Sequence, residues 1–204
     1  PTINKSEHDF SIEGKFIRFG LNAIKGVGGK AIESIVGCRN ELGEFKTLKD
    51  FLENVDLSVV NKGVLESLVK SGSFDDINPN RTQLFESIEL ILDSARKLQE
   101  DKASGQGNLF GFNTDNGEGV DVSVELLKVK EWIENEKLHY EKDVLGLYMT
   151  GHPLAKFEKE IKKYSSTTIK DLNGSSDGSE VSIVGIISNV QIRRAQKSGK
   201  QYAF

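Results

Sequence analysis

The sequence predicts a mainly α-helical chain with a small β-hairpin at its N-terminal side and β-strands at its end. Apolar residues recur at helical spacing over much of the chain, as in residues 62–71, where they form one stripe. Near the N-terminus, two short strand-like runs flank the turn Glu13-Gly14-Lys15. Towards the end, residues 181–187 are rich in β-branched side chains, which favour strands.

Local capping residues set several of the expected helix ends. Thr47 and Asn61 are suited to be N-caps, because their side-chain oxygens can accept a hydrogen bond from a backbone N–H group. Gly72 is suited to end one helix, and Pro153 stops another because it lacks an N–H group. The expected helices are Ala31–Arg39, Leu48–Glu53, Lys62–Ser71, about Arg81 to Gln99, Val124–Tyr148 and Lys156–Tyr164.

The composition excludes several classes of function. No apolar run among the 204 residues is long enough to cross a bilayer, so no membrane partner is expected. The single cysteine, Cys38, excludes an internal disulfide and indicates a reducing, cytoplasmic compartment. One cysteine and three scattered histidines offer no zinc-site spacing, so no metal is expected. The net charge of −4 argues against a protein that coats nucleic acid through bulk charge.

The basic residues are nevertheless unevenly placed. No acidic residue interrupts the four basic residues between Glu13 and Glu33, and four more follow Glu180 without an acid. Two local basic patches on an acidic chain are typical of a protein that touches DNA at chosen points. The chain starts at Pro1 and stops at Phe204 within a strand-like run, so we expect it to be a piece of a longer protein.

The most informative stretch is the turn Lys25-Gly26-Val27-Gly28-Gly29-Lys30. Apolar residues before and after it predict two helices packed as a hairpin. Unpaired N–H groups at the start of the second helix, with lysines beside them, form a site for a phosphate. This arrangement is the helix-hairpin-helix motif, which holds a DNA backbone without reading its bases. The alternative is that the glycines only permit a tight turn between two helices.

A weaker copy of this pattern lies at residues 55–69. An apolar segment, a polar turn containing Asn61 and Lys62, and an amphipathic helix follow one another, although the copy lacks the Gly-x-Gly sequence. Two stacked copies predict a tandem helix-hairpin-helix domain. We expect Asn61 and Lys62 to lie at the DNA-binding surface, while the second copy has a mainly structural role.

Residues 101–123 are rich in Gly, Asn, Asp and Ser and lack periodicity, which predicts a flexible surface loop. The loop contains Gln106 and the adjacent apolar pair Leu109 and Phe110. Exposed apolar residues on a mobile segment are typical of a partner-binding site. The alternative is that Leu109 and Phe110 fold back onto their own domain.

The final segment predicts the start of a small β-barrel. A stretch rich in Gly and Ser, residues 173–178, precedes a long β-branched run with a central Gly185. The basic run Arg193–Lys200 then turns into another strand at Tyr202. A long strand with a central glycine, followed by a basic hairpin, is typical of the opening of an OB-fold, a fold that binds single-stranded nucleic acid.

Four blocks of the chain carry a family resemblance when they are taken in order. They are Phe19–Gly28, Asn61–Asp75, Gly105–Gly111 and Glu141–Leu154. Together they closely resemble the alpha subunits of bacterial DNA polymerase III, the C-family replicases. The resemblance spans nearly the whole chain, and the order and spacing of the blocks are more specific than any block alone.

The resemblance implies a role for each part. Residues 24–30 would contact duplex DNA, and Gln106, Leu109 and Phe110 would form the internal motif that binds the sliding clamp, the beta subunit. Residue Ser179 would begin a truncated OB domain. The metal-binding palm aspartates and the PHP domain would lie upstream, so Mg²⁺ is expected only there and this fragment would carry no catalytic residues or cofactor. The parent would be a DNA-directed DNA polymerase that also contacts other replicase subunits.

The predicted domains are a tandem helix-hairpin-helix domain at 1–103, a loop with the clamp motif at 104–123, a helical connector at 124–172 and the start of an OB-fold at 173–204. Two other functions stay open. The chain could be the helix-hairpin-helix module of a DNA repair protein, such as a ligase, although the zinc cysteines of ligases are missing. It could also be a helical protein-interaction module without DNA binding, which the negative net charge favours.

Overall fold

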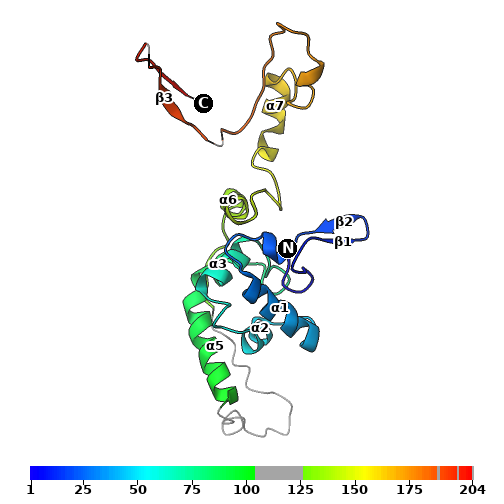
Figure 1. Ribbon diagram of the computed structural model, residues 1–204, viewed down its shortest axis with the longest axis vertical. Coiled ribbons are helices and arrows are strands. Elements are labelled where there is room, and N and C mark those ends of the chain that lie inside the picture. The colour runs from blue at the N-terminus through cyan, green and yellow to red at the C-terminus, as the bar shows by residue number, and fades with distance from the viewer. Residues whose placement is uncertain (104–125, 188, 197, 204) are drawn as a thin grey trace. The chain divides into compact units, whose positions relative to one another are not determined.

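The computed structural model describes residues 1–103, 126–187, 189–196 and 198–203, which form two units, Pro1–Thr150 and Gly151–Phe204 (Figure 1). The first unit contains β1 (Ser11–Glu13), β2 (Phe16–Arg18), the 3₁₀ turn η1 (Leu21–Ala23), α1 (Gly29–Leu42), α2 (Leu48–Asn54), α3 (Lys62–Lys70), α4 (Arg81–Glu86), α5 (Ile88–Ala103) and α6 (Glu134–Leu145). The second contains η3 (Ala155–Phe157), α7 (Glu158–Tyr164), η4 (Leu172–Gly174), β3 (Ile192–Arg194) and β4 (Gln201–Ala203).

The predicted fold class is confirmed: the described chain is mainly helical, with one antiparallel strand pair near each end. In the first pair Ile12 lies opposite Ile17. The predicted N-caps are also confirmed, because Thr47 accepts a hydrogen bond from the Asp50 amide and Asn61 accepts one from the Val64 amide. No described helix is long and apolar enough to cross a membrane.

The single helix predicted from about Arg81 to Gln99 is two helices. The chain breaks at Ser87, between α4 and α5, and the fully buried Ser87 hydroxyl accepts a hydrogen bond from the Leu127 amide at 2.9 Å. The Ser87 backbone keeps its own hydrogen bonds, because its amide donates to the Gln83 and Leu84 carbonyls and its carbonyl accepts the Ile91 amide, but its φ of −96° and ψ of 2° interrupt the helix. Periodicity does not reveal such a break, because the apolar positions stay in phase on both sides of it.

The helix predicted over 124–148 is wrong for its first part, since residues 126–133 are not helical. Their backbone groups bond instead to side chains of α4 and its N-cap. The Leu127 carbonyl accepts a hydrogen bond from Gln83, and the Val129 carbonyl accepts one from Asn80. The Trp132 amide donates to the Thr82 hydroxyl. These partners satisfy the backbone without a helix.

The core of the first unit lies among the helices from α1 to α6. Phe51 is completely buried, and its ring makes edge-to-face contacts with Phe45 and Phe74 at centroid distances of 5.2 and 5.0 Å. The N-terminal segment adds Ile3, which is also fully buried and whose amide donates to the Ser73 carbonyl.

A buried ionic network fastens α6 to the rest of this core. The Arg81 guanidinium donates two hydrogen bonds to Asp75, at 2.8 and 2.6 Å, and one to Glu141 at 2.9 Å. Arg81 is 3% exposed and Glu141 is fully buried. Burial alone would raise the pKa of Glu141, but hydrogen bonds from the Thr150 amide and from Arg81 outweigh it and hold that pKa below its usual value. Glu141 is therefore an ionised group inside the core.

The contacts therefore place α6 in the same unit as α1 to α5, whereas the sequence predicted a boundary near residue 103. In the second unit no described residue is buried, and the β-branched residues 181–187, predicted as a strand, form no described strand. A strand needs a continuous ladder of hydrogen bonds to a neighbour, whereas the hydrogen bonds described for this run join Ser182 to Ser165 and Ser166. Among the described residues of this unit, β3 and β4 form the one strand pair, with Arg193 opposite Tyr202.

Candidate nucleic-acid interface

The glycine-rich turn joins η1 to the N-terminus of α1. Val27 anchors this turn in the core. Its side chain is only 6% exposed, and its amide donates a hydrogen bond to the Ile24 carbonyl at 3.1 Å. Gly28 is the N-cap of α1 and supplies no side-chain cap. Within the described chain, the amides of Gly28, Gly29 and Lys30 have no hydrogen-bond partner, and all three residues are exposed. The turn therefore presents free N–H groups and a lysine to solvent, as an anion site requires.

Gly26 allows this turn to lie close to α3, the helix of the second predicted copy. Its φ of +91° is a conformation that L-residues rarely adopt, and a Cβ atom there would lie 2.6 Å from the Ser67 hydroxyl of α3. The glycine thus lets this glycine-rich turn, residues 25–30, which we call the first turn, pack directly against α3. This is a structural role, distinct from the exposed N–H groups of Gly28 and Gly29.

We expect Gly26→Ala to lower the free energy of unfolding by about 1–2 kcal/mol, from the positive φ alone. Gly29→Ala is the matched control, because a Cβ there meets no atom within 4 Å and alanine favours a helix more than glycine does. Urea unfolding of both variants tests this. An equal effect of the two substitutions would contradict the structural role of Gly26.

The second turn has the same form as the first. The Val59 and Val60 amides both donate to the Asp56 carbonyl, Val60 is fully buried, and Asn61 caps α3. Lys62, which follows the cap, forms an ion pair with Glu89 of α5 at 2.7 Å. This hydrogen bond raises the pKa of Lys62 above its usual value and lowers that of Glu89, so both side chains stay charged.

The two turns meet at one groove of about 680 Å³. Its lining includes Gly28, Gly29 and Lys30 from the first turn and Asn61 and Gly63 from the second. The N-termini of α1 and α3 therefore flank the same depression, as the predicted repeat requires. Two other predicted site residues, Lys25 and Lys62, are exposed but do not line it.

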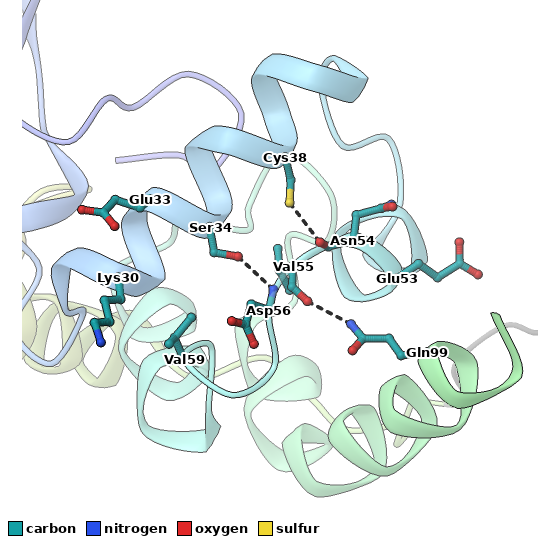
Figure 2. A pocket seen from close by; sticks show the side chains of 10 residues that line it. All are labelled: Lys30, Glu33, Ser34, Cys38, Glu53, Asn54, Val55, Asp56, Val59 and Gln99. Carbon is teal, nitrogen blue, oxygen red and sulfur yellow. Dashed lines mark hydrogen bonds between the residues drawn. The ribbon is translucent and has the colours of Figure 1, made fainter. Parts of the chain in front are cut away.

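An acidic pocket of about 750 Å³ adjoins this groove, and Lys30 lines both (Figure 2). Glu33, Glu53 and Asp56 contribute carboxylates to it. Hydrogen bonds from Ser58 lower the pKa of Asp56, which keeps that carboxylate ionised. Negative charges of this kind repel phosphate, so an anion would be favoured only on the groove side of Lys30. Within the described residues, no cluster of acidic, histidine or cysteine side chains could hold a metal ion.

The structure adds three residues that sequence reasoning missed: Ser67 behind Gly26, Glu89 paired with Lys62, and Val144 of α6, whose carbonyl accepts the Lys25 amide at 2.8 Å. Each contact is tertiary and leaves no local sequence signal. The predicted clamp-binding residues Gln106, Leu109 and Phe110 lie outside the described residues.

Known proteins resemble this chain both in the helix-hairpin-helix motif and along nearly its whole length. The helix-hairpin-helix motif family matches residues 1–84. Proteins named DNA polymerase III subunit alpha match nearly the whole chain. That of Borreliella burgdorferi is 34% identical over 100% of this chain and 18% of its own length. Those of Haemophilus influenzae and Mycobacterium tuberculosis H37Rv are each 36% identical, over 98% and 100% of this chain and 17% of their own length.

The chain spans less than a fifth of the length of these relatives, so they contain much that it lacks. The match nevertheless covers both units. The chain is therefore homologous along its whole length to one segment of the bacterial DNA polymerase III alpha subunit.

Proposed function

We propose that this chain is part of a replicative DNA-directed DNA polymerase, in which it binds the backbone of duplex DNA independently of sequence. The observation that carries the proposal is the single groove flanked by the N-termini of α1 and α3, with free N–H groups at Gly28, Gly29 and Lys30. Helix N-termini and lysines attract phosphates, and phosphate contacts carry no sequence information. A replicase needs such binding, because it must act on every sequence.

In this proposal the chain's role is mechanical. Nucleotidyl transfer and its Mg²⁺ ions belong to parts of the longer polymerase outside this chain, which contributes no catalytic residue. The groove holds duplex product in the cytoplasm, and the rest of the polypeptide contacts other replicase subunits. A soluble repair module or a pure protein-interaction module would share the fold, but the whole-length match to polymerase subunits favours the replicase.

The binding is tested by fluorescence anisotropy with two labelled duplexes of unrelated sequence, over a series of salt concentrations. We expect equal affinities in the non-specific range of about 10⁻⁴–10⁻⁶ M, falling steeply as salt rises. Absence of binding at low salt would refute DNA binding and favour the protein-interaction alternative.

We expect Glu89→Gln to strengthen duplex binding and to steepen the salt dependence by about one phosphate contact, because it releases Lys62 from its ion pair. Lys62→Gln alone is expected to change little. In the Glu89→Gln background, Lys62→Gln is expected to remove the whole gain, which a double-mutant cycle measures. An equal gain with or without Lys62 would show that Glu89 acts only by general repulsion.

We also propose that Gln106, Leu109 and Phe110 bind the sliding clamp, on the basis of the sequence resemblance. Two apolar side chains entering a pocket would contribute about 1.5–3 kcal/mol each before the cost of ordering the segment. Combining Leu109→Ala with Phe110→Ala is expected to abolish clamp binding in surface plasmon resonance while leaving the melting temperature nearly unchanged. A large fall in melting temperature with clamp binding intact would place both residues in the core instead.

A further inference from the structure

Helix α6 lies outside residues 1–84, which match the helix-hairpin-helix motif, yet it holds the first turn of that motif. The Lys25 amide donates to the Val144 carbonyl in the last turn of α6 at 2.8 Å. The Val144 and Leu145 side chains are 8% and 7% exposed, and both belong to the core. Figure 1 shows α6 beside α3, the helix that packs behind Gly26. The turn that carries the free N–H groups at the start of α1 is therefore also hydrogen-bonded to α6.

The position of α6 depends in turn on Glu141, three residues before Val144 and so on the same side of the helix. One Glu141 oxygen accepts a hydrogen bond from Arg81 at 2.9 Å. The other accepts the Met149 and Thr150 amides at 2.9 and 3.0 Å. One buried carboxylate thus joins the core, helix α6 and the last two residues of the first unit.

We propose that α6 is a working part of the nucleic-acid site and that Glu141 is a positioning residue, which links order in the first turn to order at Met149 and Thr150. This inference rests on the proposed duplex binding. A duplex that holds the first turn in this conformation stabilises the Lys25–Val144 hydrogen bond, and with it the arrangement of α6 that Glu141 maintains. Because linkage between two sites is reciprocal, DNA on the turn slows local opening at residues 149–150, and disorder there weakens DNA binding.

Amide hydrogen exchange of the full chain, measured by NMR with and without a mixed-sequence duplex, tests the link. Slower exchange is expected at Lys25, Met149 and Thr150 when the duplex is bound. Slowing confined to residues 25–30 would overturn the proposal.

Glu141→Gln tests the positioning role, because an amide cannot accept hydrogen bonds from Arg81 and from both backbone amides at once. It is expected to speed exchange at the Lys25 amide and to weaken duplex binding at least about fivefold. The slope of affinity against salt is expected to stay unchanged, because no phosphate contact is removed. Parental exchange at Lys25 in the folded variant would overturn the role of Glu141.

Gly146→Ala keeps the proposal testable if Glu141→Gln does not fold. Gly146 closes α6 at a φ of +76° with open space around its Cβ position, so alanine strains the turn that presents Val144. Gly43→Ala is the control, since Gly43 closes α1 at a φ of +88° and a ψ of −166°, also in open space, where alanine is strained at least as much as at Gly146. Only Gly146→Ala is expected to speed exchange at Lys25, and equal behaviour of the two variants would overturn the role of α6. Exchange at Lys25 in free protein decides this point even if the parent binds no duplex.

Discussion

Replacing Arg81 with alanine is expected to lower the free energy of unfolding of the first unit by about 3–5 kcal/mol, because it leaves the buried Glu141 carboxylate without its cationic partner. Arg81 is the only described cation hydrogen-bonded to Glu141, which is fully buried, and it also holds Asp75 through two hydrogen bonds. The loss therefore exceeds the value of any single hydrogen bond. Chemical denaturation followed by the fluorescence of Trp132, the chain's single tryptophan, measures it.

Arg96→Ala provides the control for this measurement. Arg96 pairs with Asp93 at 3.1 Å on the surface of α5, where both side chains are more than half exposed. Exposed pairs of this kind contribute no more than about 1 kcal/mol. If Arg81→Ala cost no more than Arg96→Ala, the ionic network would not be what fastens α6 to the core.

Combining Gly28→Val with Lys30→Glu is expected to weaken duplex binding by about tenfold or more at low salt, and to lessen its salt dependence. A Cβ atom at Gly28 meets nothing within 4 Å, and Gly28 lines the groove, so the valine side chain would project towards a bound backbone. The glutamate at position 30 replaces an attractive charge by a repulsive one. Valine at the N-cap costs about 1 kcal/mol, which leaves the domain folded.

The control for this pair is Lys97→Glu, an identical charge change at an exposed position of α5 that does not line the groove. It is expected to change duplex affinity only slightly at moderate salt, because screening weakens the effect of a charge away from the contact. Anisotropy titrations of all three proteins compare the effects. Parental affinity in the Gly28→Val, Lys30→Glu protein would place the DNA contact elsewhere on the chain.

The elements that sequence predicted correctly are those that local chemistry determines. Thr47 and Asn61 cap helices through hydrogen bonds to an amide three residues later. The turn at residues 13–15 joins two strands that only two residues separate. The errors occurred where distant groups decide the backbone. Residues 126–133 are not helical, because side chains of α4 and its N-cap supply hydrogen-bond partners for their backbone. Ser87 interrupts the helix within a regular apolar stripe, at the point where its hydroxyl accepts the distant Leu127 amide.

The same distinction holds for the candidate site. The glycine-rich turn and the free N–H groups at Gly28–Lys30 follow from residues adjacent in sequence, so the sequence could predict them. Their supports could not be predicted in this way. Val144 acts through a backbone carbonyl, which any residue type supplies, and Glu89 meets Lys62 only because α5 packs beside α3. Burial of Glu141 likewise follows from tertiary packing, since in sequence it is one of many acids on a charged helix.

The most direct test of the central claim, that duplex DNA binds at the groove between the two turns, is a titration of ¹⁵N-labelled full chain with a mixed-sequence duplex, followed by amide chemical shifts. We expect the largest shifts at Gly28, Gly29 and Lys30, with smaller ones at residues 61–63, and their reversal as salt is added. Shifts concentrated at Arg193 and Arg194 of β3, with the amides of residues 28–30 unmoved, would contradict it.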